Sequence, residues 1–196
     1  MFNLKFDATK QKINEQDLLL DSTEEIMHLI FKGEEKIPDF GKETAAVLII
    51  GKTGAGKSTL LNYIAGIHLE GEESGVKLKL KPSLSQKPIA EMATATSAVS
   101  KTDFPNFWKK EDINTIFCDC PGFGDTGGDA KQIVNAFFVK RVLDAGERFK
   151  IVLVVDEKDC RDVSGSFMEI LQSIASLLPN FYEYRGSIAI ILSKID

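Results

Sequence analysis

Residues 51–62 read GKTGAGKSTLLN and follow directly after the apolar run AAVLII at residues 45–50. The first eight match the pattern G-x-x-x-x-G-K-[S/T], whose glycines let successive backbone N–H groups turn toward the oxygens of a phosphate. The apolar run predicts a buried strand, and the residues after Lys57 predict a helix that ends near Gly66. A strand before the loop and a helix after it favour a phosphate-binding loop over a chance glycine-rich turn.

This loop supplies candidate ligands for a nucleotide. We expect the Lys57 amine to reach the β- and γ-phosphates and the Ser58 hydroxyl to ligate Mg²⁺. The residues of the stretch that are predicted to bind nucleotide are Gly51, Lys52, Thr53, Gly54, Ala55, Gly56, Lys57, Ser58 and Thr59.

A second motif, DCPG at residues 119–122, follows an apolar stretch at 113–118 that predicts another strand. Ligands of an open parallel sheet bind at the carboxyl ends of its strands, so Asp119 is expected to approach the same Mg²⁺ through a water molecule. The backbone N–H of Gly122 is expected to sense the γ-phosphate. The four-residue pattern also describes an ordinary turn, and its position after a phosphate loop favours the functional interpretation.

A third motif, SKID at residues 193–196, follows the apolar run SIAIIL at 187–192. A carboxylate at this place can accept hydrogen bonds from N1–H and from the exocyclic amine of guanine, a pair of donors that adenine lacks. Asp196 is therefore the candidate for guanine recognition, and the stem of Lys194 is expected to pack over the base. A solvated strand end is the alternative, and the motif by itself favours neither.

The rest of the chain alternates between expected strands and helices. Strands are expected near 102–108 and 113–118, at 151–155 and at 187–192, and helices at about 129–145 and 165–178. Continuous apolar strands between helices predict a three-layer α/β/α fold around a mostly parallel sheet. Residues 70–100 are expected to be irregular, with VKLKLK at 76–81 as a candidate edge strand.

Residues 1–43 form an expected amino-terminal extension of the domain at 44–196. Ser22 followed by Glu25 is typical of a capping box, so a short helix is predicted there. His28 and His68 are isolated, and neither is given a catalytic role.

Composition narrows the class of protein. The chain has 196 residues and a net charge of −5, which predicts one globular domain and argues against nucleic acid as a partner. No apolar run approaches the roughly 18 residues of a membrane span, so a cytoplasmic protein is expected. The three cysteines, Cys118, Cys120 and Cys160, fit buried free thiols better than a disulfide framework or a zinc site.

Taken together, the three motifs over residues 44–196 resemble the translation-factor-related class of P-loop GTPases. DCPGFGDT at 119–126 is similar to the D-T-P-G-F-G-D-T signature of the septin-like branch, which includes immunity-associated nucleotide-binding proteins and chloroplast import receptors. The resemblance implies a P-loop NTPase fold that binds GTP or GDP with Mg²⁺. Ser193 departs from the usual N/T-K-x-D pattern. The chain stops at Asp196, before the last base-contacting loop of the family, so a G domain truncated at its carboxyl end is expected.

The same resemblance implies a switch threonine between the phosphate loop and Asp119. Thr102, in the SKT sequence at 100–102, is the expected γ-phosphate-sensing Mg²⁺ ligand, with Thr94 and Thr96 as alternatives. The expected catalytic residues are Lys57, Thr102 and Gly122, and the expected metal ligands are Ser58, Thr102 and Asp119.

Hydrolysis is expected to be slow. Many small GTPases have a water-orienting Gln directly after D-x-x-G, and here that position is Phe123, whose ring cannot hydrogen-bond to water. The segment from Gly71 to Thr102 contains no Arg, and an arginine finger is worth roughly 10³ to 10⁵ in rate. An activating partner, or the nucleotide-dependent homodimer that the resemblance implies, would complete the site. One alternative is a P-loop ATPase. The other is a scaffold protein that does not hydrolyse its nucleotide and uses it only to stabilise an interface.

Overall fold

The computed structural model describes residues 15–41, 43–74, 77–90, 104–122, 129–145, 148–162, 165–178 and 181–195. In these residues a five-stranded sheet has the order β4-β5-β1-β6-β7. The strands are β1 Ala45–Ile50, β4 Asn106–Lys110, β5 Thr115–Asp119, β6 Arg148–Asp156 and β7 Ile188–Ser193. β1 pairs parallel with β5 and β6, β6 pairs parallel with β7, and β4 pairs antiparallel with β5. The predicted mostly parallel sheet is confirmed.

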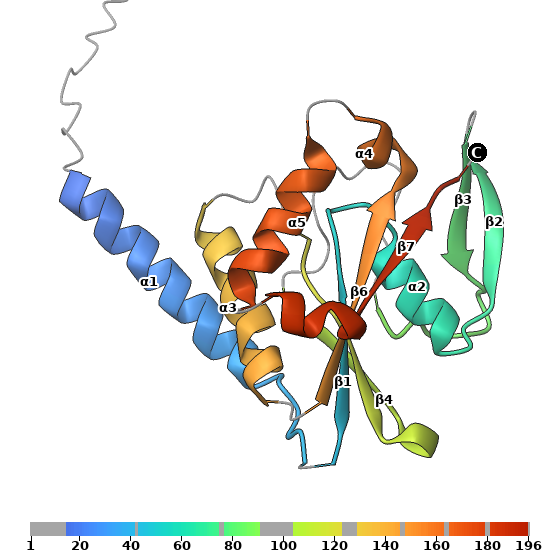
Figure 1. Cartoon of the computed structure of the whole chain (residues 1–196), viewed down its shortest axis with the longest axis horizontal. Coiled ribbons are helices and arrows are strands. Elements are labelled where there is room, and N and C mark those ends of the chain that lie inside the picture. Colours follow the sequence, from blue (N-terminus) through green and yellow to red (C-terminus); the bar gives the residue numbers. More distant parts are fainter. Residues whose placement is uncertain are drawn as a thin grey trace, which may run out of the picture.

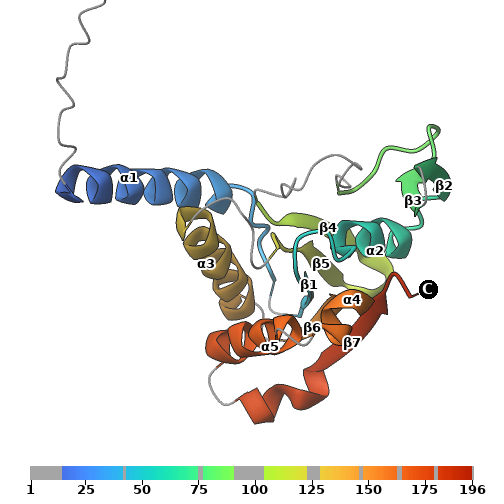
Figure 2. The same ribbon diagram turned by 90° about the horizontal axis from the view of Figure 1, so that it is seen from above.

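Helices cover both faces of this sheet (Figures 1 and 2). The helices are α1 Glu15–Glu34, α2 Lys57–Ile64, α3 Asp129–Ala145, α4 Glu157–Arg161 and α5 Ser166–Leu177, with 3-10 turns η1 Glu111–Ile113 and η2 Phe181–Ser187. The predicted three-layer α/β/α arrangement is therefore confirmed, and α3 has the predicted bounds. Beyond the layers, α1 runs away from the sheet, and an ion pair of 3.6 Å joins its Glu34 to Arg141 of α3.

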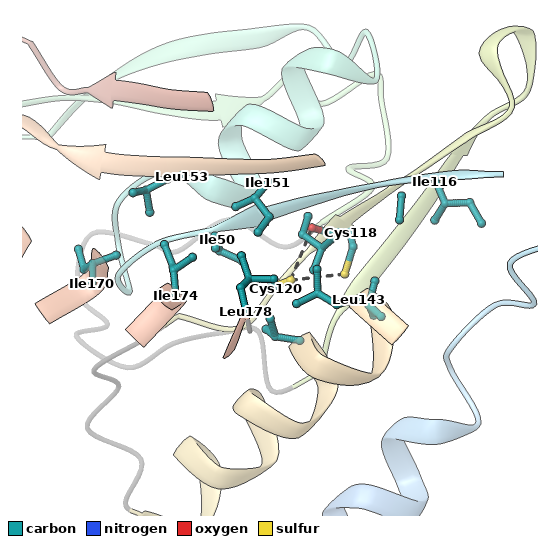
Figure 3. Close-up of a cluster of buried hydrophobic side chains, with 14 of the residues drawn as sticks. Ile50, Ile116, Cys118, Cys120, Leu143, Ile151, Leu153, Ile170, Ile174 and Leu178 are labelled. Atoms are coloured by element: carbon teal, nitrogen blue, oxygen red, sulfur yellow. Dashed lines mark hydrogen bonds between the residues drawn. The ribbon is translucent and has the colours of Figure 1, made fainter. Parts of the chain in front are cut away.

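Alternate residues of β1 build the two halves of the core. Leu48 lies in a buried cluster with residues of α3 and α5, part of which is drawn in Figure 3. Ile49 lies in a second cluster with Leu61 of α2. Each of these side chains is fully buried, which stabilises the fold by about 1.5–3 kcal/mol per side chain. The strand is fixed from both sides, so the loop that follows it leaves the sheet at a defined point.

Two cysteines belong to the first of these clusters. Cys118 and Cys120 are buried as free thiols on the same face of the sheet, with their Sγ atoms 3.5 Å apart (Figure 3). Burial, followed by the contact with Cys120, raises the pKa of the Cys118 thiol well above its ordinary value. The expectation of buried thiols is confirmed for these two and wrong for Cys160, which is exposed on α4.

The segment after α2 is more regular than expected. Strands β2 Leu69–Ser74 and β3 Lys77–Pro82 pair antiparallel in a separate two-stranded sheet. The register places Glu70 opposite Lys81, and opposite charges directly across a strand pair favour the pairing. VKLKLK therefore contributes to a hairpin and not to an edge of the main sheet.

Two boundaries and one further helix are among the other differences from the expectation. β4 begins at Asn106, directly after Pro105, which lacks the N–H that a sheet ladder needs; residues 102–103 of the expected strand lie outside the described residues. α1 begins at Glu15, before the capping box, since the residues that precede Ser22 are mostly good helix formers. α4 was not expected, because its five residues, four of them charged, carry no apolar periodicity. No helix of the described residues is long and apolar enough to span a membrane.

Candidate nucleotide site

Four parallel strands end at one edge of the sheet, and each is followed by the phosphate loop or ends in a polar residue. The phosphate loop follows β1, Asp119 ends β5, Asp156 ends β6 and Ser193 ends β7. The parallel registers of β1, β5, β6 and β7 bring these ends together (Figure 1). This is the edge at which open α/β sheets bind ligands.

The phosphate loop has the backbone that its glycines predict. Gly54 and Gly56 have φ angles of 81° and 101°, in the left-handed region that L side chains rarely adopt. Gly56 is the N-cap of α2 and has no side chain to cap the helix, so the first backbone N–H groups of α2 are left for another partner. An anion at this helix start is the partner that such N–H groups and the helix dipole favour.

Lys57 lies across the loop that precedes it. Its side chain is buried, with 6% exposure, and Nζ donates to the backbone carbonyl of Lys52 at 2.9 Å. A buried ammonium needs partners, and Lys57 has both the Lys52 carbonyl and the Asp119 carboxylate, whose pKa the Lys57 charge lowers. Lys52 itself forms an ion pair of 3.4 Å with Asp159 of α4.

Ser58 and Asp119 meet directly. Ser58 Oγ donates to Asp119 Oδ2 at 2.7 Å, although 61 residues separate them in the chain. Asp119 is fully buried, and its Oδ1 has no hydrogen-bond partner among the described residues. Burial raises the pKa of Asp119, and the Ser58 hydrogen bond, the Lys57 charge and the Asn106 side chain only partly offset this. The structure thus places Asp119 beside Ser58 through a direct hydrogen bond, and the approach of Asp119 to Mg²⁺ through a water molecule stays a prediction.

These groups fit a magnesium ion. Mg²⁺ prefers oxygen ligands, and it is typically bound through one or two carboxylates and substrate phosphates. Ser58 Oγ and Asp119 supply a hydroxyl and a carboxylate side by side, and the buried Oδ1 of Asp119 has capacity for a further contact. No cluster of three or more His, Cys, Asp or Glu side chains that could hold a metal by itself occurs in the described residues.

Gly122 lies against the phosphate loop. A Cβ added to Gly122 would come within 2.3 Å of Thr53 Oγ1 and 2.6 Å of the Thr53 backbone nitrogen, so only glycine fits there. On its other side, the Gly122 carbonyl accepts a long hydrogen bond of 3.4 Å from the buried side chain of Asn135 on α3. The DCPG turn is thus held between the loop and α3.

The SKID motif also contacts the loop. Ser193 Oγ lies 2.7 Å from the Ala55 carbonyl and 3.1 Å from the Val155 carbonyl, and it can donate to either. The serine at this position therefore links the end of β7 to the phosphate loop. Lys194 has a left-handed φ of 55°, and its Nζ donates to Asp156 Oδ2 at 2.7 Å.

Asp156 was missed by sequence reasoning. Partial burial raises the pKa of Asp156, but the hydrogen bonds from Lys194 and from the Lys158 backbone N–H, with the charges of both lysines, outweigh burial and lower it. The same carboxylate caps α4. A carboxylate at the end of an apolar strand was the signal that could have found this residue.

Asn62 was missed as well. Its side chain is fully buried, and Nδ2 donates to the carbonyls of Ser58 at 2.9 Å and Ala90 at 2.8 Å. Oδ1 accepts from the backbone N–H groups of Ile89 at 2.7 Å and Ala90 at 3.3 Å. Asn62 therefore joins the first turn of α2 to residues 89–90, and a polar residue on the apolar side of a helix was the available signal.

Several predicted residues are not placed. Thr94, Thr96, Thr102, Phe123 and Asp196 lie outside the described residues. Of the remaining candidates, the structure brings together the phosphate loop, Asp119, Gly122 and Lys194 at one edge of the sheet. Thr59 lies in the first turn of α2.

A family model and a solved structure are similar to this chain. Residues 46–191 match the family model described as 50S ribosome-binding GTPase. A solved structure described as the crystal structure of an SsGBP and GDP complex is similar with a TM-score of 0.40 and 14% identity, over 96% of this chain and 48% of that chain. This chain thus spans about half the length of that protein. A search of curated proteins gives no match. Because the family model spans the phosphate loop, Asp119 and most of β7, the chain belongs to this family of P-loop GTPases and contains its GTP-binding G domain.

Proposed function

We propose that the chain binds GTP or GDP with Mg²⁺ at the carboxyl edge of its sheet and hydrolyses GTP slowly. The observation that carries this proposal is the hydrogen bond of 2.7 Å between Ser58 and Asp119, which joins the phosphate loop to the DCPG turn. Residues 51–59 would surround the phosphates, with Lys57 at the β- and γ-phosphates and the Gly122 N–H at the γ-phosphate.

The metal would be held by Ser58 and by Asp119 through a water molecule, and Thr102 would complete the set. When bound, Mg²⁺ neutralises charge on the phosphates. The unpaired Oδ1 of Asp119 supports this assignment, because buried carboxylate oxygens are rarely left without a partner.

Guanine would be recognised by Asp196, with the stem of Lys194 over the base. Two contacts support this placement. Ser193 Oγ lies 2.7 Å from the Ala55 carbonyl, and Lys194 is held by Asp156. The motif is therefore tied both to the phosphate loop and to the neighbouring strand.

Slow hydrolysis is supported by the positions of the four arginines. Arg141 pairs with Glu34, Arg148 donates to the Glu43 carbonyl, Arg161 pairs with Glu157 and Arg185 is exposed in η2. None of these contacts is with the phosphate loop, and Phe123 replaces a water-orienting Gln. We propose that a second copy or an activating partner supplies the missing group.

The cellular role that fits best is a nucleotide-controlled switch or assembly module of the septin-like branch. DCPGFGDT at 119–126 supports the branch. In this proposal residues 44–196 are the G domain, and residues 1–43, including α1, are an extension of it.

The rate of phosphate release from GTP, measured with Mg²⁺ at a series of protein concentrations, tests this proposal. We expect slow release at low concentration and faster release per molecule as concentration rises, because copies would complete each other's sites. Chelation of Mg²⁺ should stop release at every concentration. Fast release that does not depend on concentration would contradict the need for a partner, and no release at any concentration would favour a non-hydrolysing assembly role.

A further inference from the structure

Two buried polar side-chain atoms of the described residues have no hydrogen-bond partner, and both lie at the nucleotide site. They are Asp119 Oδ1 and Thr53 Oγ1. Buried polar groups are nearly always paired in folded proteins, because an unpaired one loses its contacts with water and gains nothing in return. The Asp119 oxygen is accounted for by the proposed metal, and the Thr53 hydroxyl is not.

The phosphate-loop pattern does not require a side chain at Thr53. This residue stands at one of the four variable positions of G-x-x-x-x-G-K-[S/T], where the backbone N–H groups alone cradle phosphate. A threonine that only filled space would not need a hydroxyl. The hydroxyl has no partner among the described residues, and an oxygen of a bound phosphate would supply one.

The position of the hydroxyl indicates which part of a nucleotide it would meet. Thr53 Oγ1 lies against Gly122, since a Cβ on that glycine would come within 2.3 Å of it. The N–H of Gly122 is proposed to face the γ-phosphate. The residues proposed to lie at the base have other contacts: Ser193 contacts Ala55, and Lys194 contacts Asp156. The Thr53 hydroxyl is thus on the side of the terminal phosphate.

We propose that Thr53 determines specificity for the nucleoside triphosphate over the diphosphate, by donating a hydrogen bond from Oγ1 to a terminal phosphate oxygen. This inference rests on the proposed binding of guanine nucleotide. A hydroxyl that pairs only with the third phosphate contributes to the affinity for GTP and contributes nothing to the affinity for GDP. The Thr53 hydroxyl would also contact the terminal phosphate in a site where no arginine of the described residues contacts the phosphate loop.

The test is a comparison of Thr53→Val, Thr53→Ser and Thr53→Ala with the unaltered protein. Valine keeps the shape of threonine and removes the hydroxyl, serine keeps the hydroxyl, and alanine is the matched partner of serine if valine does not fit. Dissociation constants for GDP and for a non-hydrolysable GTP analogue are measured with Mg²⁺, and melting temperatures are measured without nucleotide.

We expect Thr53→Val to weaken binding of the GTP analogue by about tenfold and to change GDP binding by less than about twofold. Thr53→Ser should bind both nucleotides as the unaltered protein does, and Thr53→Ala should resemble valine. Equal losses for the two nucleotides, or no loss for either, would overturn the role of Thr53 and leave the proposed function intact. Failure of the unaltered protein to bind guanine nucleotide would instead overturn the proposed function.

Discussion

Single side chains at the carboxyl edge of the sheet are held where a charged ligand would need them. Lys57 is buried with its amine on the Lys52 carbonyl, and Asp119 is fully buried beside Ser58. Burying charged groups costs free energy unless they are paired, and perturbed ionisable groups cluster at functional sites. The burial of Lys57 and Asp119 therefore supports the proposed binding of phosphate and metal at this edge.

Replacing Lys57 with alanine should abolish nucleotide binding. The amine is proposed to contact two phosphates, and charge-assisted hydrogen bonds of this kind are lost together, which predicts an affinity lowered by roughly 100-fold or more. Titration of a fluorescent GDP analogue measures this. Lys150→Ala, at an exposed lysine in β6, is the matched control and should bind normally. Retained binding by Lys57→Ala would refute the whole site.

At the scale of elements, the site is assembled by contacts between segments that are far apart in the sequence. Asn62 of α2 holds residues 89–90, and Ala90 lies in the same buried cluster as Ala55 of the phosphate loop. Similarly, α4 holds the loop through the Asp159–Lys52 ion pair. α2 and α4 thus brace the phosphate loop.

Asn62→Ala should destabilise the fold. The change removes four hydrogen bonds and leaves the buried backbone groups of Ala90 unpaired, so we expect a loss of about 2–3 kcal/mol in the free energy of unfolding. Urea denaturation of the nucleotide-free protein measures it. Gln172→Ala, at an exposed position of α5, should change stability by less than about 0.5 kcal/mol. A loss for Asn62→Ala no larger than that for Gln172→Ala would show that the buried amide does not brace the loop.

At the scale of the whole molecule, the sequence predicted the elements that are marked by patterns between residues close together in the chain. The phosphate loop, the apolar strands and α3 follow from glycine spacing and periodicity within a few turns of chain. Asp156 and Asn62 did not follow, because their partners lie 38 and 28 residues away and only the folded chain shows them. The strand at 76–81 was expected at a sheet edge, but its partner β2 was missed, since residues 69–74 contain three glutamates and no apolar alternation.

The central claim is that this sheet edge binds a guanine nucleotide, and a competition experiment tests it most directly. The protein is loaded with a fluorescent GDP analogue in the presence of Mg²⁺, and unlabelled GTP or ATP is added in increasing concentration. The hydrogen bonds proposed between the Asp196 carboxylate and the guanine donors predict that GTP displaces the analogue at a concentration at least roughly 100-fold lower than ATP does. Displacement by GTP and ATP at equal concentrations would contradict the account.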